Sequence, residues 1–273
     1  MTIKNILVAF NGSEASVSAL HYAAASVRDS GGHVTALLAH ASNEIVNSHD
    51  AWVPASARKI INDANADILQ QIEAHFEALR TELNLGDRLH FISAAGRVDA
   101  VISQCARSFD ILVVGRYSAD DSDSHVVVHP DRVALLSGRP VLVIPPKYKW
   151  DEPHAHAAVA WDGSRAAARA LSDSLRMLKL QGQVSVLTVG NETLPRPIGE
   201  VIDHLQRQGV KAQHINLKQN RGIGEALVDF CADNDPCMLV MGAYEHSKFR
   251  DDFFGGMTST VLRKIRTPLL LSH

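Results

Sequence analysis

The sequence predicts an α/β protein made of two tandem, doubly wound domains, each with a five-stranded parallel sheet. Three observations predict this. Short apolar segments alternate with helix-like segments along the chain, and landmark motifs of the first half recur in order in the second. Aromatic residues make up only 5% of a chain that is 46% hydrophobic. Cores of Val, Ile, Leu and Ala suit buried parallel strands covered by helices on both faces.

The internal repeat rests on three pairs of matching segments. They are Ile6–Ser13 with Ala157–Ser164, Asp110–Gly115 with Pro236–Gly242, and Arg139–Ile144 with Thr267–Leu271. Three matches in one order favour duplication, and 273 residues suit two domains at roughly 150 residues each. We therefore predict domains at 1–149 and 150–273. The boundary falls in 145–154, which has the proline and charge content of a linker.

The first half is expected to form five strands joined by four helices. The strands are apolar runs bounded by Gly, Pro or polar residues, at 4–10, 33–39, 88–93, 110–115 and 140–145. The helices are expected at 14–29, 55–84, 97–108 and 130–137. Ser13 stands where an N-cap is expected. The second helix has apolar residues at helical spacing, which predicts a core-facing stripe, with a partner-binding face as the alternative: Ile68, Leu69, Ile72, Phe76 and Leu79.

The second half repeats this plan in fewer residues. Its strands are expected at 156–161, 183–189, 210–215, 237–242 and 268–272, with four helices between them. Ser164 takes the place of Ser13 as an N-cap. The extra length of the first half lies mainly around residues 45–85.

Charge and composition exclude several classes of function. A net charge of -3 without a basic run gives no reason to expect nucleic acid as a partner. The chain enters a strand-like run at once and has no apolar stretch of about 18 residues. We therefore expect no signal peptide, no membrane partner and a cytoplasmic location.

Cysteine and histidine patterns do not indicate a metal or catalytic centre. Cys105, Cys231 and Cys237 lack the spacing of a zinc site or a disulfide framework, so we expect buried small hydrophobes. His125 and His129, and likewise His154 and His156, lack the Glu of a His-Glu-x-x-His pair. No metal ligand and no catalytic residue is assigned.

Candidate binding residues follow the first and fourth strands of the second half. In open α/β sheets, ligands bind beyond the carboxyl ends of the strands, where the strand order reverses. The segments there are Asp162–Ser164, Gly242–Ser247 and Phe254–Thr260. Glycines allow close approach of the backbone, and free N–H groups at a helix start hold phosphate. Taken alone, Gly-Gly before a helix is equally well explained by turn chemistry.

These segments resemble the signature of universal stress proteins. The resemblance lies in Met241–Ser247 followed by Phe254–Thr258, and in Trp161–Ser164, and the whole chain resembles the tandem members of that family. It implies a Rossmann-like domain of the adenine nucleotide alpha hydrolase-like type, with five parallel strands and four helices. Many members bind ATP through a Gly-x2-Gly-x9-Gly-(Ser/Thr) loop, so ATP with its Mg²⁺ is the implied cofactor.

The resemblance also implies roles for individual residues. Asp162 would contact the adenosine, Val189 would hold the adenine edge through backbone groups, and Gly242 would begin the phosphate loop. Backbone or hydroxyl groups would reach the phosphates from Gly255, Gly256, Met257 and Thr258.

Two positions depart from the family pattern. Glu245 replaces the second loop glycine, and Gly256 replaces the small hydroxyl residue. A side chain at positive φ costs roughly 1 kcal/mol. A carboxylate near phosphate adds about 1–4 kcal/mol of repulsion, so ATP binding would weaken by about one to three orders of magnitude. Lys248 and Arg250 would offset this unless they belong to a solvated loop.

The first half has drifted further from the pattern. Asn11 replaces the acidic residue after the first strand, and no second loop glycine follows Gly115. Asp120, Asp121 and Asp123 make this region anionic, so we expect no nucleotide here. A cation site is the alternative, but the segment lacks the Gly turn and terminal Glu of a Ca²⁺ loop. A solvated loop is favoured.

Three functions are weighed. The leading hypothesis is a non-catalytic stress-response regulatory module that binds ATP or another adenine nucleotide in its C-terminal domain. The alternatives are a slow ATP hydrolase, with Glu245 and His246 as candidate groups, and an interaction scaffold that binds no nucleotide. Family dimers often pair through their last strands. In an intramolecular pseudo-dimer, Arg139–Ile144 would lie beside Pro268–Leu271; a homodimer of the tandem unit is left open.

Overall fold

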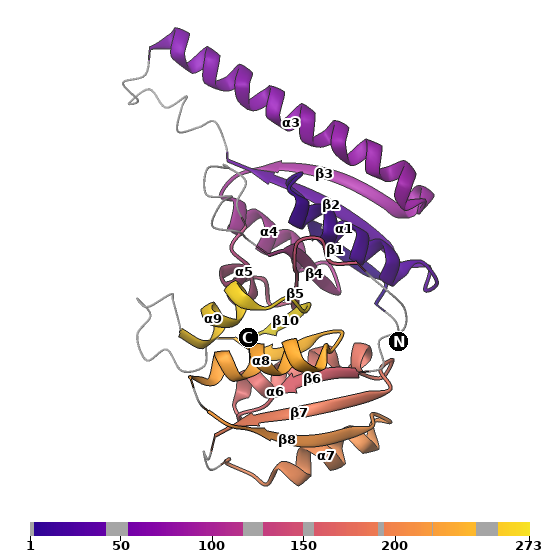
Figure 1. Cartoon of the computed structure of the whole chain (residues 1–273). Helices are drawn as coiled ribbons and strands as arrows, with labels where there is room; N and C mark the ends of the chain where they lie inside the picture. The colour runs from indigo at the N-terminus through magenta and orange to yellow at the C-terminus, as the bar shows by residue number, and fades with distance from the viewer. Residues whose placement is uncertain are drawn as a thin grey trace.

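The computed structural model describes residues 3–41, 54–116, 128–149, 156–190, 194–219, 221–243 and 256–273. These residues form one ten-stranded sheet with helices on both faces (Figure 1). The strand order is β3-β2-β1-β4-β5-β10-β9-β6-β7-β8. The predicted α/β class and the doubly wound five-stranded arrangement in each half are confirmed.

The elements of the first half lie within two residues of the predicted ranges. They are β1 (Asn5–Ala9), α1 (Glu14–Val27), β2 (His33–His40), α3 (Ala55–Leu83), β3 (Leu89–Ala95), α4 (Val98–Ala106), β4 (Ile111–Gly115), α5 (Pro130–Ser137) and β5 (Val141–Ile144). A 3₁₀ turn, η1 (Gly86–Arg88), precedes β3.

The second half repeats the order. Its elements are β6 (His156–Ala160), α6 (Arg165–Leu178), β7 (Gln183–Val189), α7 (Ile198–Arg207), β8 (Ala212–Leu217), α8 (Ile223–Asn234), β9 (Leu239–Gly242), α9 (Gly256–Lys264) and β10 (Leu269–Ser272). The start of β8 was predicted two residues too early. Val210 belongs to the turn at the end of α7 rather than to β8, because its N–H donates to the Leu205 carbonyl at 2.9 Å.

The two halves are joined by one antiparallel strand pair. All other pairs in the sheet are parallel, but β10 runs against β5, with Leu270 opposite Leu142. The predicted contact between the last strands of the halves is thus confirmed. Because the direction reverses here, the carboxyl ends of the two sets of strands lie at opposite ends of the sheet. The predicted domain boundary adjoins residues outside the described ranges and stays a prediction.

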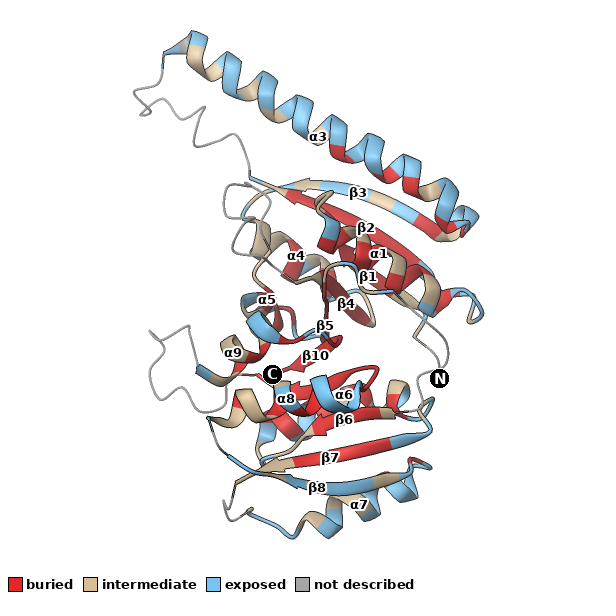
Figure 2. Cartoon of the chain, in the orientation of Figure 1, coloured by how far each residue is buried: buried red, intermediate tan, exposed pale blue. Residues whose placement is uncertain are grey.

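The core has two layers, one on each face of the sheet. Helices α1, α3, α6 and α7 cover one face, and α4, α5, α8 and α9 cover the other. Neighbouring strand residues alternate between the layers: Val8 faces the first and Leu7 the second, and both are fully buried. The central strands are buried along their length, whereas the outer strands β3 and β8 are partly exposed (Figure 2). Burial on both faces explains why these strands are continuous apolar runs.

Helix α3 accounts for the greater length of the first half. It has 29 residues, against 10 for its counterpart α7. Ile72, Phe76 and Leu79 are buried as the predicted stripe requires, but Ile68 is 47% exposed, which corrects that part of the stripe. A 29-residue helix is about 43 Å long, whereas an eight-residue strand covers about 27 Å. The N-terminal part of α3 therefore extends past the sheet (Figure 1).

The helix starts follow the predicted capping. Ser13 Oγ accepts from the Ser16 N–H at 3.3 Å, and Ser164 Oγ accepts from the Ala167 N–H at 3.1 Å. Each bond satisfies one unpaired donor of the first helical turn. Both N-cap predictions are confirmed. None of the helices in the described ranges combines the length and apolar character needed to cross a membrane.

Candidate functional site

The candidate site of the second half lies where its strand order reverses. Strand β6 stands between β7 and β9, so the crossovers to β7 and from β8 to β9 go to opposite sides of it. Asp162 follows the carboxyl end of β6, and Gly242 ends β9. The two strands are paired directly, with Val159 opposite Val240. The sequence therefore places Asp162 and Gly242 at the topological switch point, where ligands of such sheets bind.

Asp162 shapes the turn into α6 and adds a negative charge beside it. Its Oδ1 accepts a hydrogen bond from the Ser164 N–H at 2.9 Å, and the residue is exposed. In the first half, Asn11 Oδ1 accepts from the Ser13 N–H at 3.1 Å. An amide and a carboxylate thus serve the same turn. The turn does not require an acid, so the charge of Asp162 is a difference in chemistry between the two edges.

Gly242 is required by packing. A Cβ at this position would lie 2.5 Å from the Ala166 carbonyl carbon and 2.6 Å from the Ala167 nitrogen. Gly115 makes the same close approach, because its Cβ would lie 2.5 Å from the Ala15 carbonyl carbon. The glycine that begins the proposed phosphate loop therefore has a structural reason in both halves.

The first turn of α9 rests on the backbone of α8. A Cβ on Gly224 would lie 3.1 Å from the Met257 carbonyl oxygen, so the two helices approach closely at this point. Gly256 is exposed and Met257 is half-buried. Thr258 is only 3% exposed, which leaves its hydroxyl little access to a ligand from solution. The backbone at Gly256 and Met257 is the better candidate for phosphate contacts.

Half-buried apolar side chains surround this edge of the sheet. Val189 ends β7, Ile223 begins α8 and Met257 lies in the first turn of α9, and all three pack against the same core layer. Such residues suit the apolar part of a ligand, with a few polar groups to orient it. Val189 ends its strand as predicted, in register with Leu217.

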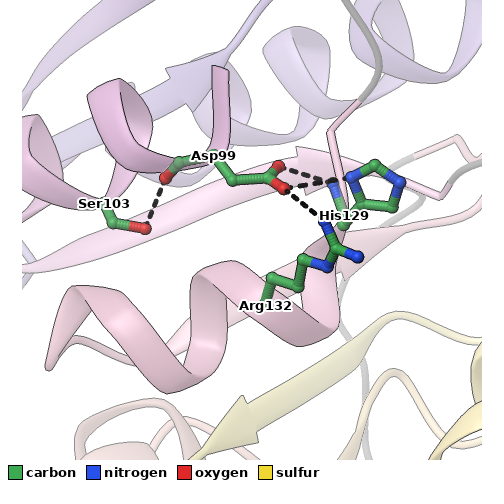
Figure 3. A network of polar contacts seen from close by, with 4 residues as sticks. All are labelled: Asp99, Ser103, His129 and Arg132. Atoms are coloured by element: carbon green, nitrogen blue, oxygen red, sulfur yellow. Dashed lines mark hydrogen bonds and ion pairs between the residues drawn. The ribbon is translucent and has the colours of Figure 1, made fainter. Parts of the chain in front are cut away.

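In the first half, the carboxylate of Asp99 lies at the position that corresponds to Gly224 in the second half. His129 and Met257 are equivalent positions of the repeat. Each lies the same number of residues before the proline that precedes the last strand, Pro140 in the first half and Pro268 in the second. The second residues of α4 and α8 are Asp99 and Gly224. Asp99 Oδ1 accepts from the His129 N–H at 3.1 Å, and Asp99 Oδ2 lies 3.1 Å from His129 Nδ1. Figure 3 shows both contacts.

Two further features complete this network. Arg132 Nη1 lies 3.7 Å from the same Asp99 carboxylate, and Ser103 Oγ donates to the Asp99 carbonyl at 2.6 Å. Pro130 is the first residue of α5 and has no N–H. The N-terminus of α5 is thus already paired with an anion of its own chain.

Helix α3 also covers the end of β1. A Cβ on Gly12 would lie 3.3 Å from Ile72 Cγ1, and the rings of Phe10 and Phe76 meet edge to face at 5.8 Å. Phe10 is 1% exposed, whereas Trp161, its counterpart, is only half-buried. In the second half, Pro195 covers the equivalent glycine, because a Cβ on Gly163 would lie 2.6 Å from Pro195 Cδ.

Several predicted residues lie outside the described ranges: Glu245, His246, Lys248, Arg250 and Gly255 at the second edge, and Asp120, Asp121 and Asp123 at the first. Their roles stay predictions, as does the approach of Gly255 to Gly242. Asp162, Val189 and Gly242 share the carboxyl edge. Gly256 begins the helix that returns the chain from this edge to β10.

Comparison with known proteins assigns the family. The model described as the universal stress protein family matches residues 2–145, which is more than half of the chain. This chain belongs to the universal stress protein family. A curated relative, universal stress protein Slr1230 of Synechocystis sp., is 25% identical over 98% of this chain and 99% of its own length.

Solved structures of the family reproduce the whole architecture. A universal stress protein from Archaeoglobus fulgidus DSM 4304 is similar over 98% of this chain and 95% of its own, with a TM-score of 0.68 and 15% identity. A putative universal stress protein from Pseudomonas aeruginosa UCBPP-PA14 covers 99% and 93%, with a TM-score of 0.57 and 17% identity. These likenesses show the fold that this universal stress protein shares with both.

Two of the three cysteines of this universal stress protein are poor nucleophiles because they are buried. Cys231 and Cys237 are buried as predicted, and burial raises the pKa of each thiol to about 12. Cys105 is half-buried. Within the described ranges, no three His, Cys, Asp or Glu residues gather as metal ligands do. Asp99 was not singled out from the sequence. Aligning α4 with α8 would have indicated it, because Asp99 then stands opposite Gly224.

Proposed function

We propose that this universal stress protein is a non-catalytic regulatory module that binds an adenine nucleotide at the carboxyl edge of its second half. ATP, accompanied by Mg²⁺, is the expected ligand. Its phosphates lie towards the N-terminus of α9 and its adenosine lies between Asp162 and the end of β7. The first half binds no nucleotide and serves as a structural partner.

The contrast between Gly224 and Asp99 carries this proposal. Asp99 accepts the His129 N–H and supplies the N-terminus of α5 with a negative charge. Gly224, which lies close to the Met257 carbonyl and the Thr260 side chain of α9, has no side chain to do so. Free N–H groups and the positive end of the helix dipole favour an anion at such a terminus. At the second edge, where Gly224 carries no charge, a phosphate group supplies it.

Asp162 and Val189 give the edge its selectivity for a nucleoside. The carboxylate is exposed beside the turn into α6 and accepts hydrogen bonds from hydroxyl groups such as those of ribose. The half-buried side chains of Val189, Ile223 and Met257 offer apolar contact to a flat base. In this proposal the apolar side chains contact the base, Asp162 contacts the ribose and the N-terminus of α9 contacts the phosphates.

Calorimetry with ATP, ADP and AMP tests the proposal. Asp162→Asn removes the charge but keeps an acceptor for the Ser164 N–H, as Asn11 does for Ser13. We expect this variant to bind about threefold to tenfold more weakly, because a hydrogen bond to a charged group becomes a neutral one. Asn11→Ala is the matched control in the first half and leaves the affinity unchanged.

The absence of heat and of a thermal shift at millimolar nucleotide overturns the proposal and favours the interaction scaffold. Release of phosphate above that of a heat-inactivated sample instead favours the hydrolase. Repeating the titration in EDTA measures the contribution of Mg²⁺.

A further inference from the structure

Arg116 of the first half contacts the last turn of α9 in the second half. It follows Gly115 at the end of β4, and its Nη1 donates to the carbonyls of Arg263 at 2.9 Å and Ile265 at 3.0 Å. Donor and acceptors are 147 and 149 residues apart in the chain. The contact therefore crosses from one half to the other at the far end of the helix that begins at Gly256.

The contact meets a physical need of α9. The last carbonyls of a helix have no partner within it, and the C-terminal end of its dipole favours a cation. A guanidinium that donates to two carbonyls supplies both the hydrogen bonds and the charge. Burial lowers the pKa of Arg116, and the nearby charge of Arg266 lowers it further. The guanidinium is thus held in a partly desolvated place between the halves.

The residue of the second half that corresponds to Arg116 cannot return this contact. The Arg116 N–H donates to the Ile144 carbonyl at 2.7 Å, and the Ala243 N–H donates to the Ser272 carbonyl at 2.9 Å. Arg116 and Ala243 are therefore equivalent positions of the repeat, and alanine has no side-chain donor. At this pair of positions, the restraint runs from the half without the proposed ligand site to the half with it.

We infer that Arg116 is a positioning residue through which the first half holds α9 and so regulates the proposed nucleotide site. This inference rests on the proposed function. Helix α9 has only nine residues, or about 14 Å of length, so a shift at its last turn moves its first turn as well. Arg116 stands where the first half would itself begin a phosphate loop. It acts instead on the phosphate-binding helix of the other half.

Hydrogen exchange of the full chain without nucleotide tests the restraint itself. In Arg116→Ala, amides of residues 257–265 are expected to exchange about tenfold faster than in the wild type. Arg139→Ala is the matched control, because Arg139 donates to the Arg107 carbonyl at 2.7 and 3.2 Å within the first half. It leaves exchange in α9 unchanged. Equal exchange in the wild type and Arg116→Ala overturns the inference, whether or not nucleotide binds.

Calorimetry with ATP then tests the link to the site. Arg116→Ala is expected to bind about threefold to tenfold more weakly, with Arg116→Lys in between and Arg139→Ala unchanged. Faster exchange with unaltered affinity overturns the regulatory role. If the wild type binds no nucleotide, the proposed function fails and the regulation fails with it. The exchange data then still measure the restraint, so the two failures are distinguishable.

Discussion

At the carboxyl edge of the first half, Asp99 is bonded to the first turn of α5 and α3 lies over the end of β1. At the second edge, Gly224 stands in place of Asp99, and α7 has about a third of the length of α3. The turns and the strand-end glycines are the same in both halves. The comparison teaches that a duplicated fold retains its backbone requirements while the side chains around the carboxyl edge are free to differ in charge and size.

The largest effect is expected where the two halves are alike. Gly115→Val and Gly242→Val each force side-chain atoms into helix backbone that lies 2.5 Å from the first added carbon. We expect each to lower the free energy of unfolding by about 3 kcal/mol or more, measured by urea denaturation. Gly199→Val, at a position with nothing within 4 Å, is the control. A tolerated valine at either strand end contradicts the shared packing role.

The next effect tests the difference between the edges. Gly224→Asp gives the second half the carboxylate that Asp99 provides in the first. We expect ATP binding to weaken by about tenfold or more, because a like charge near phosphate costs about 1–4 kcal/mol. Gly224→Asn introduces the same bulk without the charge and measures the steric cost alone. Equal affinities of the two variants contradict the electrostatic account.

The reverse change in the first half is expected to affect stability. Asp99→Asn weakens the bonds to His129 and the ion pair with Arg132, and we expect a loss of about 1–2 kcal/mol, given the partial exposure of the group. Thermal unfolding measures it. Asp131→Asn, in the first turn of the same helix, should cost about 0.5 kcal/mol. ATP binding by the first half of Asp99→Asn would show that Asp99 alone excludes the ligand.

The smallest effect compares the two N-caps. Ser13→Ala and Ser164→Ala each remove one hydrogen bond to the first turn of a helix, so each should cost about 1 kcal/mol. Urea denaturation of the two variants checks the equality. A cost confined to one of them would show that the two turns are not equivalent.

Local chemistry made most of the fold predictable. Buried parallel strands are short apolar runs between turn residues, which is why their ranges were predicted within two residues. The exposure of Ile68 was not predictable from periodicity, because the pattern of a helix does not reveal where the sheet beneath it ends. Gly242 was interpreted as a phosphate-loop residue, and that role stays a prediction. Its close packing against α6 is a separate requirement of the fold that the sequence did not reveal.

The missed residues act across long stretches of chain. Asp99 meets His129 across 30 residues, and Arg116 meets Arg263 across 147. Neither contact produces a periodic pattern or a motif in the sequence, so neither could be predicted from it. The family model matches residues 2–145, yet the phosphate-loop pattern lies in the other half. The family match and the proposed nucleotide site therefore lie in different parts of this chain.

The antiparallel pairing of β5 with β10 has a consequence for how the two halves associate. Either half expressed alone would expose a four-residue strand of buried side chains with unpaired backbone groups, a surface prone to self-association. Covalent fusion makes that association intramolecular, with an effective concentration in the millimolar range. Dilution that dissociates a pair of single-domain chains leaves this pair assembled.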